Sequence, residues 1–199
     1  MAALSPSTEH IADSSVFRAA LRGEKLAARM SLAADSRLAL SARIEANLLQ
    51  LLTPLAPQTL AFYASVRGEF DAQPLVSLLI ERGWRAAMPI VDAPDTPMSF
   101  RNWSPGVAMG VDRFGIPIPA EGGAIAPDIV LLPLVAFDSQ GFRLGYGGGY
   151  FDRTLAALVP RPFSIGVGFE LARAKDIRPQ PHDIRLDAIV TEAGIVRHG

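Results

Sequence analysis

Residues 128–153 read DIVLLPLVAFDSQGFRLGYGGGYFDR. The apolar run at 128–137 is typical of a buried central strand, and a helix is expected from about Tyr150 to Leu158. Between them, five glycines fall within residues 141–149, where a usual glycine share of roughly 7% would place about one. A strand, a glycine-rich loop and a helix in this order indicate an α/β protein, in which ligands bind beyond the carboxyl ends of the strands. We therefore expect the functional site at this loop.

Short apolar segments alternate with helical segments over the rest of the chain. Strands are expected at 59–65, 84–91, 98–103, 163–169, 186–191 and 194–197. Helices are expected from Asp13, Ser14 or Ser15 to Met30, at 35–52 and at 74–83, with residues 1–12 as a flexible leader. The alternation predicts a single α/β domain over residues 1–199, a three-layer Rossmann-like sandwich with a largely parallel central sheet.

The first two predicted helices are amphipathic. In the first, an apolar side contains Phe17, Leu21 and Ala28. The basic residues that lie largely opposite are Arg18, Arg22, Lys25 and Arg29. In the second, the side expected to face the core consists of Leu38, Ala42, Leu48, Leu49 and Leu52.

The composition excludes several classes of function. Nineteen basic and twenty acidic residues give a net charge of -1, which argues against non-specific nucleic-acid binding. Without cysteine there is no disulfide, thiolate nucleophile or Cys-based metal site. The most apolar run, 129–137, is far shorter than the roughly 20 residues that span a membrane. We expect a cytoplasmic protein with no nucleic-acid or membrane partner, and a monomer.

The glycine-rich loop favours phosphate binding. Glycines allow backbone N–H groups to face an anion, and the following helix adds partial positive charge. Arg143 and Arg153 supply full charges; the basic residues include only two lysines, Lys25 and Lys175. The loop matches neither a Walker A sequence nor GxGxxG, so a flexible turn is the alternative. Asp152 at the helix start suits either magnesium beside phosphate or a favourable interaction with the helix dipole.

Three further clusters carry candidate chemistry. Glu69 and Asp71 follow the strand at 59–65 and suit a polar heterocycle or acid–base chemistry, although a solvated loop is the more common explanation for such residues. His182 beside Asp183 suggests a metal or proton-transfer site. Among the aromatic side chains, Trp103 and Phe114 are candidates for lining a ligand pocket, with core packing as the alternative.

Ordered motifs over most of the chain resemble the 5-formyltetrahydrofolate cyclo-ligase family, also called 5,10-methenyltetrahydrofolate synthetases. They are FRAALRGEKLAAR (17–29), FYASVRGEFDAQPL (62–75), FGIPIP (114–119), LLPLVAFDSQGFRLGYGGGYFDR (131–153) and PHDIRLDAIVTE (181–192). The block at 131–153 is the most specific of them.

The resemblance implies a reaction driven by positioning and positive charge. In this family, ATP transfers its γ-phosphoryl group to the formyl oxygen on nitrogen 5 of the folate. Nitrogen 10 then attacks, and loss of phosphate leaves the methenyl bridge. Such chemistry needs an aligned phosphate and cationic groups more than acid–base residues. ATP and Mg²⁺ are the implied co-substrate and cofactor.

The resemblance also assigns residues by position. It implies Arg143 and Tyr150 as catalytic residues and Asp152 and Asp183 as magnesium ligands. The implied ATP-binding residues are Arg18, Arg22, Arg143, Gly145, Tyr146, Gly147, Gly148, Gly149, Tyr150 and Phe151. The implied folate-binding residues are Ala64, Glu69, Tyr146, Gly147, Gly148, Gly149 and Tyr150.

The chain departs from the family pattern at four positions. Arg18 stands where lysine is usual, which exchanges a compact charge for a planar fork. Tyr146 and Gly148 stand where some members have basic residues, and Phe151 replaces a common tyrosine. An active enzyme is the leading hypothesis; a non-catalytic folate- or nucleotide-binding module on the same fold is the alternative, and a phosphotransferase acting on another small acceptor is a weaker one.

Overall fold

The computed structural model describes the backbone of residues 8–198 and the side chains of residues 14–198. A seven-stranded sheet forms the centre of this part of the chain. In spatial order its strands are β11 (Gly194–Arg197), β10 (Ala188–Thr191), β9 (Phe163–Val167), β6 (Ile129–Pro133), β1 (Thr59–Ala61), β2 (Arg85–Ile90) and β3 (Ser99–Trp103). The strands from β10 to β2 are parallel, and β11 and β3 add antiparallel edges. The predicted, largely parallel sheet is confirmed.

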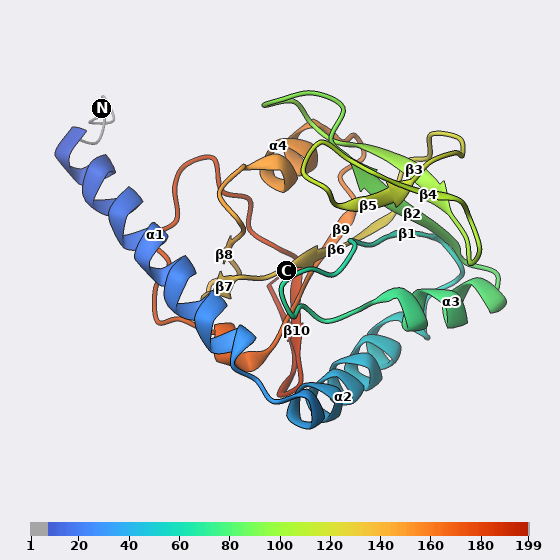
Figure 1. Ribbon diagram of the computed structural model, residues 1–199, viewed down its shortest axis with the longest axis horizontal. Helices are drawn as coiled ribbons and strands as arrows, with labels where there is room; N and C mark the ends of the chain where they lie inside the picture. Colours follow the sequence, from blue (N-terminus) through green and yellow to red (C-terminus); the bar gives the residue numbers. More distant parts are fainter. Residues whose placement is uncertain (1–7, 199) are drawn as a thin grey trace.

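Helices cover both faces of the sheet, which gives the three predicted layers (Figure 1). Strand side chains alternate between the two faces, so that Leu60 and Leu131 pack with α2 (Ala34–Leu52) and α3 (Gln73–Glu81). Their neighbours Ala61 and Val130 pack on the other face, with α4 (Tyr150–Ala157). The core is therefore continuous apolar strand sequence enclosed on two sides, as expected for parallel strands.

The order of the strands creates a switch point between β1 and β6. Beyond β1 the chain proceeds to β2 on one side, whereas beyond β6 it proceeds to β9 and β10 on the other. The loops that follow β1 and β6 therefore diverge at the carboxyl edge of the sheet, which is where α/β proteins bind ligands.

The predicted central strand at 128–137 is broken in two. β6 ends at Pro133, and β7 (Ala136–Phe137) pairs antiparallel with β8 (Arg143–Leu144). Asp138 closes the turn between them, because its carboxylate accepts hydrogen bonds from the amides of Gln140 and Phe142. This hairpin carries the glycine loop away from the sheet and toward α1.

The first helix, α1 (Thr8–Met30), begins ahead of the predicted capping residues, so residues 8–12 are helical; residues 1–7 of the predicted leader lie outside the described residues. It packs beside β7 and the short helix η1 (Glu170–Ala172) (Figure 1). Its buried side includes Arg18 and Arg29, not only the apolar residues. The predicted division into an apolar inner side and a basic outer side is therefore wrong, because polar partners in the body of the molecule receive these arginines.

Other differences concern short or exposed segments. The strand predicted at 59–65 ends at Ala61, and the one at 163–169 ends at Val167. A hairpin of β4 (Met109–Val111) and β5 (Pro117–Pro119) was not predicted. In α2 the buried residues are Ile44, Leu48, Leu51 and Leu52, whereas Leu38 and Ala42 are exposed, contrary to the prediction. No helix within residues 8–198 is long and apolar enough to cross a membrane.

Candidate active site

The glycine loop connects β8 to α4 and has the backbone that its sequence predicts. Gly147 has φ +102° and Gly149, the residue before α4, has φ +65°, conformations that L side chains rarely adopt. Arg153 in α4 donates a hydrogen bond to the carbonyl of Gly148 at 2.6 Å. The loop therefore holds a compact, glycine-dependent turn at the amino end of a helix.

Two arginines of α1 face this region of the molecule. Arg22 donates from Nε to the carbonyl of Gly145 at 2.9 Å. Burial, and secondarily the neighbouring Arg18, lower the pKa of the Arg22 guanidinium, which remains cationic at neutral pH. Because Arg18 and Arg22 are one helical turn apart, both lie on the side of α1 that covers the loop.

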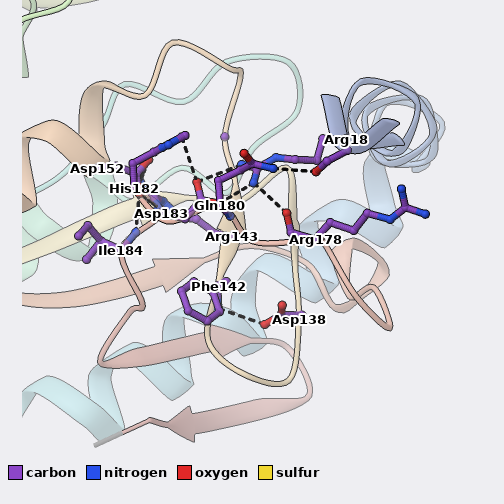
Figure 2. A network of polar contacts seen from close by, with 12 residues as sticks. Arg18, Asp138, Phe142, Arg143, Asp152, Arg178, Gln180, His182, Asp183 and Ile184 are labelled. Carbon is purple, nitrogen blue, oxygen red and sulfur yellow. Dashed lines mark hydrogen bonds and ion pairs between the residues drawn. The ribbon is translucent and has the colours of Figure 1, made fainter. Parts of the chain in front are cut away.

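Arg18 forms a buried ion pair with Asp183 (Figure 2). Its two terminal nitrogens contact the two carboxylate oxygens of Asp183, and one also donates to the carbonyl of Arg178 at 3.2 Å. The amide of Gln180 donates to Asp183 at 2.7 Å. Burial alone would raise the pKa of Asp183, but the hydrogen bonds from Arg18 and Gln180 together lower it below its ordinary value.

A second ion pair joins Arg143 to Asp152. Arg143 is 4% exposed, and its NH1 lies 2.8 Å from Oδ1 of Asp152. The same Oδ1 accepts the amide of Ile184 at 3.0 Å, which brings the segment around Asp183 beside the start of α4 (Figure 2). The two aspartates that were predicted as metal ligands are therefore in neighbouring segments, and each is accompanied by an arginine.

The donor set is consistent with magnesium that is bound together with phosphate. Within residues 14–198 there is no group of three or more His, Asp or Glu side chains that could hold a metal by itself. Magnesium, however, commonly takes one or two carboxylates, with phosphate oxygens and water completing its shell. Asp152 would contribute through Oδ2 and Asp183 through Oδ1, because each of these two oxygens accepts one arginine hydrogen bond among residues 14–198 and keeps a lone pair for a metal.

Glu69 is buried at the carboxyl end of the sheet, not in a solvated loop. It is 8% exposed, and its Oε2 accepts the amide of Val66 at 3.0 Å. Its Oε1 accepts the hydroxyl of Tyr146 at 2.5 Å, which links Glu69 to the glycine loop. Burial raises the pKa of Glu69 above its ordinary value, although the hydrogen bonds from Tyr146 and Val66 oppose this rise. Burial and the bond to Glu69 raise the pKa of Tyr146 to about 12.

Of the remaining predicted residues, Phe114 and Ala64 lie near the candidate site, whereas Trp103 lies in the core. Phe114 lies 5.8 Å from the ring of Tyr150, centroid to centroid, so the hairpin of β4 and β5 reaches the glycine loop. Ala64 is partly buried in the loop after β1. Trp103 instead packs in the core on Phe62.

Three further predicted residues differ in their exposure and contacts. Asp71 is exposed and accepts only the amide of Gln73 among the hydrogen bonds of residues 14–198. The side chain of His182 is 72% exposed, with its Nε2 3.9 Å from Asp183. Phe151, in the first turn of α4, is partly buried against the core cluster that includes Leu155, and the guanidinium of Arg143 lies 5.9 Å from its ring centre.

Comparison with known proteins identifies the family of the chain. A family model described as the 5-formyltetrahydrofolate cyclo-ligase family matches residues 14–192. The chain belongs to this family. The cyclo-ligase of Escherichia coli (strain K12) is 31% identical over 144 residues, which make up 69% of this chain and 79% of that protein. The cyclo-ligase of Mycoplasma pneumoniae is 29% identical over 181 residues, 87% of this chain and 97% of that one.

Solved structures agree with the family and the fold. The NMR structure of Aquifex aeolicus 5,10-methenyltetrahydrofolate synthetase has a TM-score of 0.80 and 30% identity, and covers 92% of this chain and 93% of its own. The resemblance inferred from the motifs is thus confirmed, and the chain is an enzyme of the cyclo-ligase family.

One central residue, Arg29, was not predicted from the sequence. Arg29 contacts Tyr146 and lies between the loops that follow β1 and β6. Its signal was the spacing of Arg18, Arg22, Lys25 and Arg29, which places all four on one side of a helix. Because basic residues with this spacing usually lie on the solvent-exposed side of a helix, the sequence did not indicate Arg29 as a site residue.

Proposed function

We propose that this chain converts 5-formyltetrahydrofolate to 5,10-methenyltetrahydrofolate with ATP and Mg²⁺, releasing ADP and phosphate. The γ-phosphoryl group passes from ATP to the formyl oxygen on nitrogen 5. Nitrogen 10 attacks the activated carbon, the C–O bond to phosphate breaks, and the nitrogen 10 proton is lost. One observation carries the proposal: a single loop contacts Arg22 through Gly145 and Glu69 through Tyr146. A phosphate-binding backbone and a buried carboxylate suited to a pterin are therefore adjacent.

On the ATP side, the proposed contacts come from the glycine loop and α1. Backbone N–H groups of residues 145–151 would bind the phosphates, with charge from Arg18, Arg22 and Arg143. These guanidiniums already donate hydrogen bonds to carbonyl or carboxylate oxygens that hold them in place, so they need little reorganisation when the phosphates of ATP bind. Tyr150, at the first position of α4, completes this set.

On the folate side, Glu69 would accept hydrogen bonds from the amino and ring N–H groups of the pterin. Ala64 would line the same wall, and Tyr146 and Tyr150 would contact the folate from the loop. Burial makes this carboxylate selective, because a ligand without matching donors would leave the remaining lone pairs of Glu69 without hydrogen-bond partners.

Asp152 and Asp183 would hold the magnesium ion. When bound, the ion supplies positive charge to phosphate oxygens during transfer. Arg143 and Arg18 would hold these carboxylates in their orientations.

A direct assay tests the proposal. Folded protein with 5-formyltetrahydrofolate, ATP and magnesium should produce the absorbance of methenyltetrahydrofolate, and omission of ATP should abolish it. If ligand binding is measurable by calorimetry but no ATP-dependent absorbance develops, the non-catalytic binding module is the correct reading. Transfer of the γ-phosphoryl group of ATP to a different small acceptor, with release of ADP, would instead favour another phosphotransferase.

The pH dependence of the folate KM is a second expected result. Because the pKa of Glu69 is raised, its carboxylate is lost on acidification at a higher pH than for an ordinary glutamate. The KM for 5-formyltetrahydrofolate should therefore rise as the pH falls through this raised pKa, while the KM for ATP changes less. Initial rates measured between about pH 5 and pH 8 give both values.

Glu69→Gln is the control for this pH profile, because glutamine does not titrate. Any pH dependence that persists in Glu69→Gln belongs to the substrate or to other groups. An identical profile in both proteins would contradict the role of Glu69.

A cytoplasmic location and a monomeric state belong to the same proposal. The absence of cysteine is compatible with a reducing compartment. A sedimentation measurement of the purified protein tests the monomer.

A further inference from the structure

We propose that Arg29 is the positioning residue of the folate subsite: its guanidinium fixes the Tyr146 hydroxyl and the Glu69 carboxylate at the switch point between β1 and β6. The inference rests on the proposed role of Glu69 in folate binding. Arg29 itself is not assigned a contact with substrate; it acts through the two side chains that it holds.

The guanidinium reaches three separate segments. Nε donates to the carbonyl of Arg67 at 3.0 Å, in the loop after β1. NH1 donates to the carbonyl of Leu134 at 2.9 Å, directly after β6. NH2 donates to the hydroxyl of Tyr146 at 2.7 Å, in the glycine loop. One side chain from α1, 4% exposed, thus joins the loops that follow β1 and β6 to the glycine loop.

The direction of these hydrogen bonds orients Tyr146. Since Arg29 donates to the Tyr146 oxygen, the hydroxyl must direct its own proton to another acceptor, which is Oε1 of Glu69. Hydrogen bonds that follow one another in a chain, as from Arg29 to Tyr146 to Glu69, strengthen one another in a medium of low polarity. The Glu69 carboxylate is thereby held in one orientation, with NH2 of Arg29 3.6 Å from Oε1.

The other groups near Glu69 cannot replace Arg29. Arg67, on the same loop as Glu69, is exposed, with its Cζ 5.4 Å from the centre of the Tyr146 ring. The hydroxyl of Tyr63 is buried and has no hydrogen-bond partner among residues 14–198, so it does not bind Glu69. Burial, followed by the charge of Glu69, raises the pKa of Tyr63 well above its ordinary value, so it stays neutral. Arg29 is therefore the buried cation next to this carboxylate.

The variant Arg29→Lys tests whether Arg29 positions Tyr146 and Glu69 or only holds α1 against the rest of the fold. Lysine keeps the charge but, as a single ammonium on a flexible stem, cannot reach three segments in a planar fork. The KM for 5-formyltetrahydrofolate should rise about tenfold, while the KM for ATP should change less than about threefold. Equal increases in both KM values would show that Arg29 serves the whole fold, and would overturn the proposal.

Arg161→Lys is the matched control. Arg161 also donates to a backbone carbonyl, that of Arg185, and pairs with a carboxylate, Asp187. It precedes β9 at the amino end of the parallel strands, whereas the loops that Arg29 contacts follow the carboxyl ends of β1 and β6. Both KM values should stay within about twofold of the unchanged protein, since the loss is confined to a partly exposed pair.

A double-mutant cycle with Glu69→Gln distinguishes positioning of Glu69 by Arg29 from a general structural role of Arg29. If Arg29 acts through Glu69, Arg29→Lys should change the folate KM less than about twofold in the Glu69→Gln background. Independent, multiplicative effects would overturn the inference while leaving Glu69 as a folate ligand. If Glu69→Gln alone leaves the folate KM unchanged, the proposed function of Glu69 fails, and this inference fails with it.

Arg29→Gln provides a second route if Arg29→Lys does not fold. Glutamine keeps hydrogen-bond donors but removes the charge that favours ionised Glu69. The pH at which the folate KM begins to rise should move upward in Arg29→Gln. An unchanged pH profile in a folded Arg29→Gln protein would overturn the proposal.

Discussion

Asp152→Asn is expected to reduce kcat at least about 100-fold, the scale seen when one preorganised electrostatic group is removed from a transition state. The change removes one of the two proposed magnesium carboxylates. It also leaves Arg143, which is buried, beside a neutral amide in place of its ion-pair partner. The rate should be measured by methenyltetrahydrofolate absorbance at saturating ligands over a series of magnesium concentrations. The fold should persist, because the asparagine oxygen can still accept the amide of Ile184.

The stability of Asp152→Asn separates loss of chemistry from loss of structure. Urea unfolding should show a decrease of about 1–3 kcal/mol, the usual cost of an unmatched buried polar group. Asp95→Asn is the control, because Asp95 pairs with Arg153 at 3.6 Å but its side chain is 90% exposed. Its rate should be unchanged. A near-normal rate for Asp152→Asn at ordinary magnesium would show that the magnesium site is misassigned.

Glu69→Gln is expected to raise the KM for 5-formyltetrahydrofolate at least about tenfold, which corresponds to about 1.4 kcal/mol of binding. Glutamine lacks the charge and presents an N–H group where a pterin donor would approach. ATP affinity, measured by calorimetry without folate, should stay within about twofold, since Arg18, Arg22 and Arg143 are untouched.

Asp71→Asn is the matched control for Glu69→Gln. Asp71 is two residues further along the same loop, but it is exposed and accepts the amide of Gln73. Its substitution should alter neither ligand's affinity. If Glu69→Gln weakens ATP and folate binding equally, Glu69 acts on the glycine loop as a whole and not on the pterin.

The parts of the molecule that follow from local sequence were predictable. Apolar strands and the glycine cluster at 141–149 specify a strand, a loop and a helix, because buried parallel strands need unbroken apolar residues and left-handed turns need glycine. The site was therefore expected at this loop, which the structure places between β8 and the amino end of α4. The break at Pro133 was not, since the apolar sequence continues to Phe137 while the backbone turns into a separate hairpin.

The parts that depend on distant partners were not predictable. The buried positions of Arg18 and Arg29 require Asp183 and the carbonyl of Leu134, which are far along the chain. The hairpin of β4 and β5 has exposed residues and proline, so it shows no apolar alternation. Glu69 could not be distinguished from a solvated residue, because its burial comes from Tyr146 and Arg29 on other segments.

The contacts of α1 also bear on how the enzyme folds. Arg18 and Asp183 are 165 positions apart, and Arg29 and Tyr146 are 117 positions apart. Because the entropy of loop closure is lost before such distant contacts form, contacts of this kind are expected to slow folding. Secondary structure and sheet pairing can return during refolding before the two ends of the chain meet. During refolding, enzymatic activity is therefore expected to return later than the helical circular-dichroism signal, when the contacts of α1 with Asp183 and Tyr146 have formed.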